Sequence, residues 1–178
     1  MGKNIVLLGF MGTGKSSVGF YLAKKLKRKF IDMDREIEKI AGMSIAEMFK
    51  IYGEKRFRSE EELMAGKLGQ LSDLVIATGG GVVLKESNII SLRKNGILIR
   101  LNAAPEDIFE RVNRKKGVRP LLKKDLNVDN IKKMLADREK FYSCADLVIN
   151  TSGKELNDIV DEISEILQKG CTDERTGC

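Results

Sequence analysis

The sequence contains no histidine and no tryptophan, and only two of its 178 residues are proline. Without histidine, the chain has no histidine-based catalytic triad, no histidine metal ligand and no histidine general base. Catalysis would therefore depend on carboxylates, lysine, arginine, backbone amides or a metal ion held by oxygen atoms. No apolar run reaches the roughly 18 to 20 residues that a membrane helix needs. The apolar stretch Ile5 to Phe10 is also too short for a secretory signal.

Cysteine is scarce as well. Cys144, Cys171 and Cys178 are an odd number of cysteines with no paired spacing. This set argues against a disulfide framework and against a zinc site. It fits the reducing cytoplasm, where we expect the protein to act.

The charges are unequal in number, with 32 basic and 26 acidic residues and a net charge of +6. The densest basic cluster, residues 24–29, closes a predicted helix, where cations complement the helix dipole. No aromatic residues alternate with it to stack on bases, so we expect no nucleic-acid partner. A basic balance suits an anionic small-molecule substrate equally well. Nothing in the sequence is typical of an obligate interface, and we expect a monomer.

Short β-rich runs alternate with helical patterns, which indicates an α/β fold with a parallel sheet. The length favours a single domain over residues 1–169, followed by a flexible polar tail over residues 170–178. The predicted strands are 4–9, 30–33, 74–78, 97–101 and 147–149. The predicted helices are 15–29, 34–40, 44–71 (broken near Gly53), 86–94, one that begins at Pro105, 128–142 and 154–169, with a basic loop over 113–125.

The segment from Gly9 to Ser16, GFMGTGKS, matches the phosphate-loop pattern G-x-x-x-x-G-K-[ST]. An apolar strand precedes it and a helix follows it, as that motif requires. Glycines let backbone N–H groups face an anion, and the helix N-terminus adds positive charge. We expect Lys15 to contact the β- and γ-phosphates of ATP and the Ser16 hydroxyl to ligate Mg²⁺. The predicted ATP-binding residues of this segment are Gly12, Thr13, Gly14, Lys15, Ser16 and Ser17.

Two aspartates, Asp32 and Asp34, stand at the end of the second predicted strand. Alternation along a strand would place both carboxylates on one side of it, at the edge where α/β sheets bind ligands. One carboxylate then supports Mg²⁺ and the other accepts a hydrogen bond from a substrate hydroxyl. An N-cap role is the alternative for Asp34, but it leaves Asp32 unexplained.

Three consecutive glycines, Gly79 to Gly81, follow the third predicted strand. They indicate either a close approach of the backbone to a neighbour or a positive φ. A substrate wall and a plain strand exit are both compatible with them. Arg58 and Arg138 suit carboxylate binding through a planar fork, with a surface ion pair one helical turn away as the alternative. Arg119, in the basic loop, lies where a lid would bring charge to the transition state.

Together these motifs resemble the shikimate kinase family over nearly the whole chain, from Asn4 to about Leu167. The resemblance rests on motifs that occur in the same order: GFMGTGKSSVG from Gly9, DMD from Asp32, FRSEE from Phe57, TGGGV from Thr78, RPLL from Arg119 and R-x-x-x-Y from Arg138. The phosphate loop alone would identify only a superfamily, whereas the combination of motifs is specific.

The resemblance implies a three-layer α/β/α kinase fold with five parallel strands in the order 2-3-1-4-5. It also implies a substrate-binding helical segment near residues 34–61 and a lid near residues 113–125. The implied reaction transfers the γ-phosphate of ATP to the 3-hydroxyl of shikimate, a step of aromatic amino-acid biosynthesis. The implied partners are ATP, shikimate and Mg²⁺.

The resemblance also implies roles for individual residues. Asp34 would orient the attacking hydroxyl, and Asp32 would support Mg²⁺ with Ser16. Shikimate would be bound by Arg58 and Arg138 at its carboxylate, and by backbone groups of the glycines. The remaining implied contacts come from Glu61, which would steady Arg58, from Phe49 and Phe57 along the ring of shikimate, and from Arg119, Gly79, Gly80 and Gly81.

The residues that contact adenine are less well defined by motifs. Arg111 or Arg114 is a candidate to stack on the base, with the loop 150–153 as the opposite wall. Phe49 and Phe57 are alternatively core residues. Two alternative functions stay open on the residues alone: a kinase of the same fold that acts on gluconate or a nucleoside monophosphate, and a non-catalytic ATP-binding module.

Overall fold

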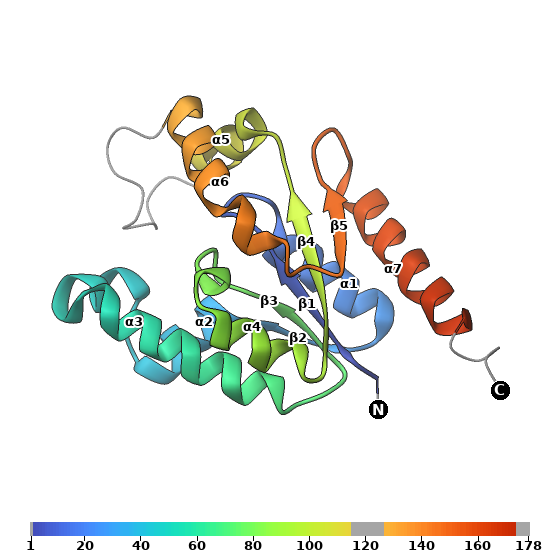
Figure 1. Ribbon diagram of the computed structural model, residues 1–178, viewed down its shortest axis with the longest axis horizontal. Coiled ribbons are helices and arrows are strands. Elements are labelled where there is room, and N and C mark those ends of the chain that lie inside the picture. Colours follow the sequence, from blue (N-terminus) through green and yellow to red (C-terminus); the bar gives the residue numbers. More distant parts are fainter. Residues whose placement is uncertain (1, 115–126, 174–178) are drawn as a thin grey trace.

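A computed structural model describes residues 2–114 and 127–173 of the chain. Five parallel strands form one sheet in the order β2-β3-β1-β4-β5 (Figure 1), which confirms the order that the resemblance implied. The strands are β1 (Asn4–Leu8), β2 (Lys29–Asp32), β3 (Leu74–Ala77), β4 (Gly96–Asn102) and β5 (Leu147–Asn150).

The central strand β1 is an unbroken apolar run, and all five of its residues are buried. It pairs with β3 on one side and with β4 on the other, so hydrogen bonds occupy both of its edges. Ile5 and Leu7 enter one hydrophobic core, whereas Val6 and Leu8 enter the core on the opposite face. This period of two residues, with apolar side chains on both faces, explains the position of β1 in the middle of the sheet.

Helices cover both faces of the sheet (Figure 1). One core joins β1 to α1 and α7, and the other joins it to α2, α3 and α4, while a smaller core packs α5 and α6 against Phe10. The helices are α1 (Lys15–Leu26), α2 (Met33–Ala41), α3 (Ile45–Gly69), α4 (Glu86–Arg93), α5 (Pro105–Arg114), α6 (Val128–Tyr142) and α7 (Leu156–Asp173), with a short 3₁₀ helix, η1 (Val82–Leu84). Among the described residues, no helix is long and apolar enough to cross a membrane.

Some predicted boundaries were wrong by a few residues. α1 ends at Leu26 because Lys27 adopts a left-handed conformation that caps it, so the helix stops short of the predicted residue 29. α3 begins after a capping box between Ser44 and Glu47, and it is kinked at Gly53, where a break was predicted. α5 continues through Arg114, so the first two residues of the predicted loop 113–125 are helical. The rest of that loop lies outside the described residues. The last helix, α7, runs to Asp173, so the first four residues of the predicted tail 170–178 are helical and that boundary was wrong. Residues 174–178 lie outside the described residues.

Candidate active site

A cavity of about 720 Å³ opens at the carboxyl ends of β1, β2 and β3. It brings together most of the predicted site residues that the structure describes. These are Gly12, Thr13, Gly14, Lys15, Ser16, Ser17, Asp32, Asp34, Arg58, Gly79, Gly80, Gly81 and Arg138. Arg119, predicted to come from the lid, lies outside the described residues.

The phosphate loop connects β1 to α1. Gly12 and Gly14 have φ angles of +81° and +96°, which L-residues with side chains rarely adopt, so the loop requires glycine at both positions. Gly14 is the N-cap of α1, and the helix therefore begins at the loop. The Lys15 ammonium donates hydrogen bonds to the carbonyls of Gly9 (2.8 Å) and Phe10 (2.9 Å), which hold it beside the cavity. This arrangement places the loop, a helix N-terminus and one cation beside the same cavity, a combination that suits an anion.

Asp32 and Asp34 both line the cavity, but not for the predicted reason. Asp32 is the last residue of β2 and the N-cap of α2, and its carboxylate accepts a hydrogen bond from the Arg35 N–H at 3.4 Å. Asp34 lies in the first turn of α2. Strand alternation therefore does not relate the two side chains, and the N-cap role that the sequence offered to Asp34 belongs to Asp32.

In the glycine segment after β3, residues 79–81, the backbone lies close to side chains of the cavity. A Cβ atom on Gly79 would lie 2.6 Å from Asp34 Oδ1 and 2.8 Å from Glu61 Oε1. A Cβ atom on Gly81 would lie 2.2 Å from Arg58 Nη1. Neither residue has a positive φ. Of the two readings that the sequence left open, close contact is therefore the one that the structure supports.

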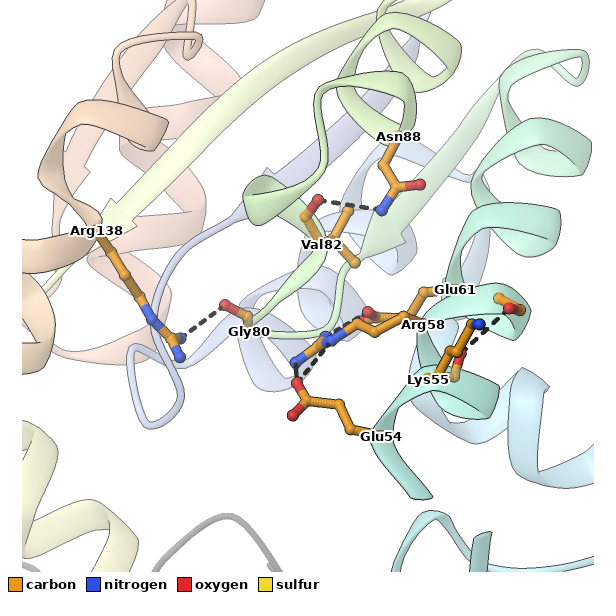
Figure 2. A network of polar contacts seen from close by, with 9 residues as sticks. Glu54, Lys55, Arg58, Glu61, Gly80, Val82, Asn88 and Arg138 are labelled. Carbon is orange, nitrogen blue, oxygen red and sulfur yellow. Dashed lines mark hydrogen bonds and ion pairs between the residues drawn. The ribbon is translucent and has the colours of Figure 1, made fainter. Parts of the chain in front are cut away.

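Arg58 lies between two carboxylates on its own helix (Figure 2). Its Nε and Nη2 atoms donate to Glu54 Oε1 at 3.1 and 2.9 Å, and its Nη1 atom donates to Glu61 Oε2. Burial disfavours the guanidinium charge, but the ion pairs with Glu61 and Glu54 outweigh burial and hold the pKa of Arg58 above its ordinary value. Arg58 is therefore a fixed cation at the cavity wall.

Glu61 is only 1% exposed. Burial raises the pKa of its carboxyl above the ordinary value, against the opposing effect of Arg58, and the neighbouring Asp34 and Glu54 carboxylates raise the pKa further. Glu61 thus lies near the negative charges of Asp34 and Glu54, and its ion pair with Arg58 compensates its own charge.

Arg138 reaches the same cavity from α6 (Figure 2). Its Nη1 atom donates to the Gly80 carbonyl at 3.2 Å, and its guanidinium carbon lies 5.2 Å from the centre of the Phe10 ring. Gly80 and Gly81 are therefore contacted by two arginines that come from helices far apart in the sequence. Both guanidinium groups border one cavity, a geometry that suits an anionic ligand.

The cavity is also lined by Arg111, Arg114, Thr151 and Lys154. Arg111 donates to the Thr151 hydroxyl at 3.0 Å and to the Thr151 carbonyl at 2.9 Å, whereas Arg114 is exposed and paired with Glu110. Of the two arginines suggested for the base, Arg111 is thus the one with a fixed position.

The two phenylalanines differ in their surroundings. Phe57 is buried, belongs to the main core and also lines the cavity. Phe49 packs against that core, with its ring centre 5.2 Å from that of Phe57. Of these two phenylalanines, Phe57 lines the cavity and Phe49 does not. Sequence reasoning gave Glu54 no role, although its position four residues before Arg58 is the usual spacing of a helical ion pair.

Comparisons with known proteins agree with this geometry. Residues 11–168 match the family model described as shikimate kinase. The shikimate kinase of Pelotomaculum thermopropionicum is 48% identical over 167 residues, which cover 94% of this chain and 96% of that protein. The shikimate kinase of Caldanaerobacter subterraneus subsp. tengcongensis is 48% identical over 161 residues, which cover 90% and 94% of the two chains.

Solved structures show the same likeness. The shikimate kinase of Acinetobacter baumannii, in complex with shikimate, has a TM-score of 0.90 and 33% identity over 96% of this chain and 95% of that one. The shikimate kinase of Aquifex aeolicus has a TM-score of 0.80 and 35% identity over 94% and 98% of the two chains. The chain therefore belongs to the shikimate kinase family, and its activity is the ATP-dependent phosphorylation of shikimate in the shikimate pathway.

Proposed function

We propose that the cavity binds ATP at the phosphate loop and shikimate at the glycine segment, and that phosphate passes between them to the 3-hydroxyl of shikimate. The observation that supports this most strongly is that the phosphate loop, Asp34 and both arginines line one cavity. The alternative acceptors, gluconate and nucleoside monophosphates, are also anions that two arginines could bind, so the family match, and not the arginines, favours shikimate over them. A non-catalytic ATP-binding module is likewise disfavoured by the family match.

The shikimate carboxylate is bound, in this proposal, by Arg58 and Arg138. Both guanidinium groups adjoin the Gly80–Gly81 backbone, so a small ring held against these glycines would reach both cations. Glu61 keeps Arg58 in place through its ion pair. Planar guanidinium groups bind carboxylates through paired hydrogen bonds, which fixes the orientation of the ring.

Asp34 accepts a hydrogen bond from the 3-hydroxyl and holds its oxygen toward the γ-phosphate. As the oxygen attacks phosphorus, the hydroxyl proton moves to the Asp34 carboxylate and the bond to the β-phosphate oxygen breaks, leaving ADP. Lys15 and the loop N–H groups balance the charge on the phosphate oxygens. Phosphoryl transfer depends mainly on positioning and charge stabilisation, which explains why a chain without histidine can perform it.

Magnesium fits the donors present on the phosphate side. Ser16 and Asp32 line the cavity next to the loop, and no group of three or more acidic or thiol side chains that could hold a metal occurs in the described part of the chain. Mg²⁺ usually takes one or two protein oxygens and completes its shell with phosphate oxygens and water. When bound, it would supply positive charge to the phosphates, with Ser16 and Asp32 as its protein-side partners.

The proposal also covers the domain organisation, the oligomeric state and the location of the enzyme. Residues 1–169 form one domain, with a substrate-binding segment near 34–61 and a lid near 113–125 that brings Arg119 to the transferring phosphate. The enzyme acts as a monomer in the cytoplasm, where ATP is supplied. Light scattering of the purified protein tests the oligomeric state.

The carboxylate assignment is tested with two substrates and two variants. Shikimate and its uncharged methyl ester are compared on the wild type, Arg58→Lys and Arg138→Lys. Losing a paired, charge-assisted hydrogen bond costs about 1.5–3 kcal/mol, so each variant should raise KM for shikimate about 10- to 100-fold. KM for the ester should change little, because the ester has no carboxylate to lose.

Arg56→Lys is the matched control, because Arg56 lies on the same helix and pairs with Glu60 outside the cavity. It should leave both KM values unchanged. Equal losses on shikimate and on the ester would contradict the assignment. The 3-hydroxyl is tested separately by phosphorus NMR of the product and by Asp34→Asn, which should lower kcat 100-fold or more while ATP still binds.

A further inference from the structure

Four carbonyl groups of the phosphate loop, those of Gly9, Phe10, Gly12 and Thr13, accept hydrogen bonds from side chains. The Lys15 ammonium donates hydrogen bonds to the Gly9 and Phe10 carbonyls, and the Thr13 hydroxyl also donates to the Phe10 carbonyl. The Gly12 and Thr13 carbonyls accept hydrogen bonds from residues that lie outside the loop and α1. Gly12 O accepts from Arg111 Nη1 at 3.5 Å, and Thr13 O accepts from the Thr151 hydroxyl at 3.2 Å. These contacts matter because a carbonyl turned into the loop would repel phosphate.

Thr151 lies directly after β5 and is only 1% exposed. Its backbone N–H donates to the Asn102 carbonyl at 2.8 Å, at the end of the neighbouring strand β4. The Thr151 hydroxyl is near both Asn102 O (3.1 Å) and Thr13 O (3.2 Å). It has one proton, and Asn102 O already receives the backbone N–H. A carbonyl oxygen can accept two hydrogen bonds, so the Thr151 hydroxyl bridges both oxygens and links the end of β4 to the phosphate loop.

The same hydroxyl also accepts a hydrogen bond. Arg111 Nη1 donates to it at 3.0 Å, and Arg111 Nη2 donates to the Thr151 carbonyl at 2.9 Å. The Arg111 guanidinium thus donates two hydrogen bonds to Thr151, and its Nη1 atom also contacts Gly12 O. Thr151 consequently connects three segments that line the cavity: the phosphate loop, α5 and the loop after β5.

We propose that Thr151 is a positioning residue for ATP, through a hydroxyl that holds the Thr13 carbonyl away from the phosphates and Arg111 against the cavity wall. The loop then presents its N–H groups to the phosphates without reorganising when ATP binds. Preorganised donors cost less free energy at binding than donors that must first turn. This inference rests on the proposed role of the phosphate loop in ATP binding, and it adds Thr151, whose hydroxyl acts through the loop and through Arg111.

The test compares Thr151→Val, which keeps the shape and removes the hydroxyl, with Thr151→Ser, which restores the hydroxyl. Calorimetry measures the binding of MgATP, and of inorganic tripolyphosphate as a probe that lacks the base. Thr151→Val should weaken both about tenfold, the usual effect of one lost buried hydrogen bond. Thr151→Ser should bind both within about threefold of the wild type, and shikimate should bind all three proteins equally.

A structural loss alone is distinguished by Ser164→Ala, which removes another buried hydroxyl, on α7 and outside the cavity. This control should leave both ligand affinities unchanged. If Thr151→Val binds tripolyphosphate as the wild type does, the phosphate-loop part of the inference is wrong. If it weakens shikimate binding equally, Thr151 is only a structural residue and the inference is overturned.

A second comparison tests the link to Arg111. The Arg111→Lys change should weaken MgATP binding. The double variant with Thr151→Val should lose less MgATP affinity than the sum of the two single losses, because both changes break the same hydrogen-bond network. Strictly additive effects would contradict the connection. Failure of the wild type itself to bind tripolyphosphate would instead overturn the proposed phosphate site, an outcome that the first measurement reveals before any variant is made.

Discussion

Gly81 is a residue whose lack of a side chain has a direct consequence for the arginine beside it. A Cβ atom there would meet Arg58 Nη1 at 2.2 Å, and this atom is the end of a flexible side chain that can move aside. We expect Gly81→Ala to fold normally but to displace the Arg58 guanidinium. KM for shikimate should rise about tenfold, the effect of one lost charged hydrogen bond. KM for ATP should not change. A KM for ATP that rises in parallel would show that the change spreads beyond the arginine.

At this scale the sequence predicted residue identities better than their local roles. Asp32, Asp34 and Arg58 were all expected in the site, and all line the cavity. The capping role, however, belongs to Asp32, because the strand ends at Asp32 and the helix starts at Met33. A shift of one residue at an element boundary exchanges these roles, and local sequence preferences do not fix boundaries to one residue. The contacts of Thr151 join segments far apart in sequence, which no local pattern reveals.

At the scale of elements, two of the three glycines in α3 have opposite surroundings. A Cβ atom on Gly66 would meet nothing within 4 Å, whereas one on Gly69 would lie 2.0 Å from the Ser91 carbonyl oxygen of α4. Gly66→Ala should therefore stabilise the protein by about 0.5–1 kcal/mol through helix propensity. Gly69→Ala should destabilise it by about 1–3 kcal/mol, because two backbones must separate. Urea unfolding measures both, and a stabilising Gly69→Ala would contradict the close packing of α3 on α4.

The elements themselves were largely predictable, for identifiable reasons. The apolar run of β1 and the helical spacing of α6 are strong local patterns, and α6 has the predicted bounds, Val128–Tyr142. The end of α1 depends on a left-handed conformation at Lys27, a residue type that does not indicate it, and the start of α2 depends on which of two nearby aspartates is the N-cap. The strand order came from the family resemblance, because the pairing of β1 with two strands much later in the chain is a tertiary property.

At the scale of the whole molecule, an ion pair joins the sheet to α6. Arg100 of β4 donates to both Glu139 oxygens, at 2.6 and 2.7 Å. The hydrogen bonds from Arg100 lower the pKa of Glu139 below its ordinary value of 4.5. A carboxyl with a lowered folded pKa contributes stability above its unfolded pKa, and this contribution disappears as the pH falls through the folded pKa. The pair therefore stabilises the protein at neutral pH and not in strong acid.

Glu139→Gln should accordingly lower Tm at pH 7 by a few degrees. The difference from the wild type should shrink steadily below pH 4.5. Thermal unfolding monitored by circular dichroism between pH 3 and pH 7 measures this. Lys25→Gln breaks an exposed pair with Asp161 and serves as a control that should move Tm little. A gap between Glu139→Gln and wild type that stays constant with pH would exclude the ion pair as its cause.

The central position of β1 also matters while the chain is being translated. Ile5 lies opposite Val75 on one side and Ile97 on the other, so a nascent chain that has emerged only through α3 offers this strand neither neighbour. β2 emerges earlier but pairs with β3 and not with β1. β1 therefore leaves the ribosome well before either of the strands that pair with it, which makes it a segment that chaperones would bind. Nucleotide binding can begin only after β4 has been synthesised, because the phosphate loop extends from a strand that is until then unsupported.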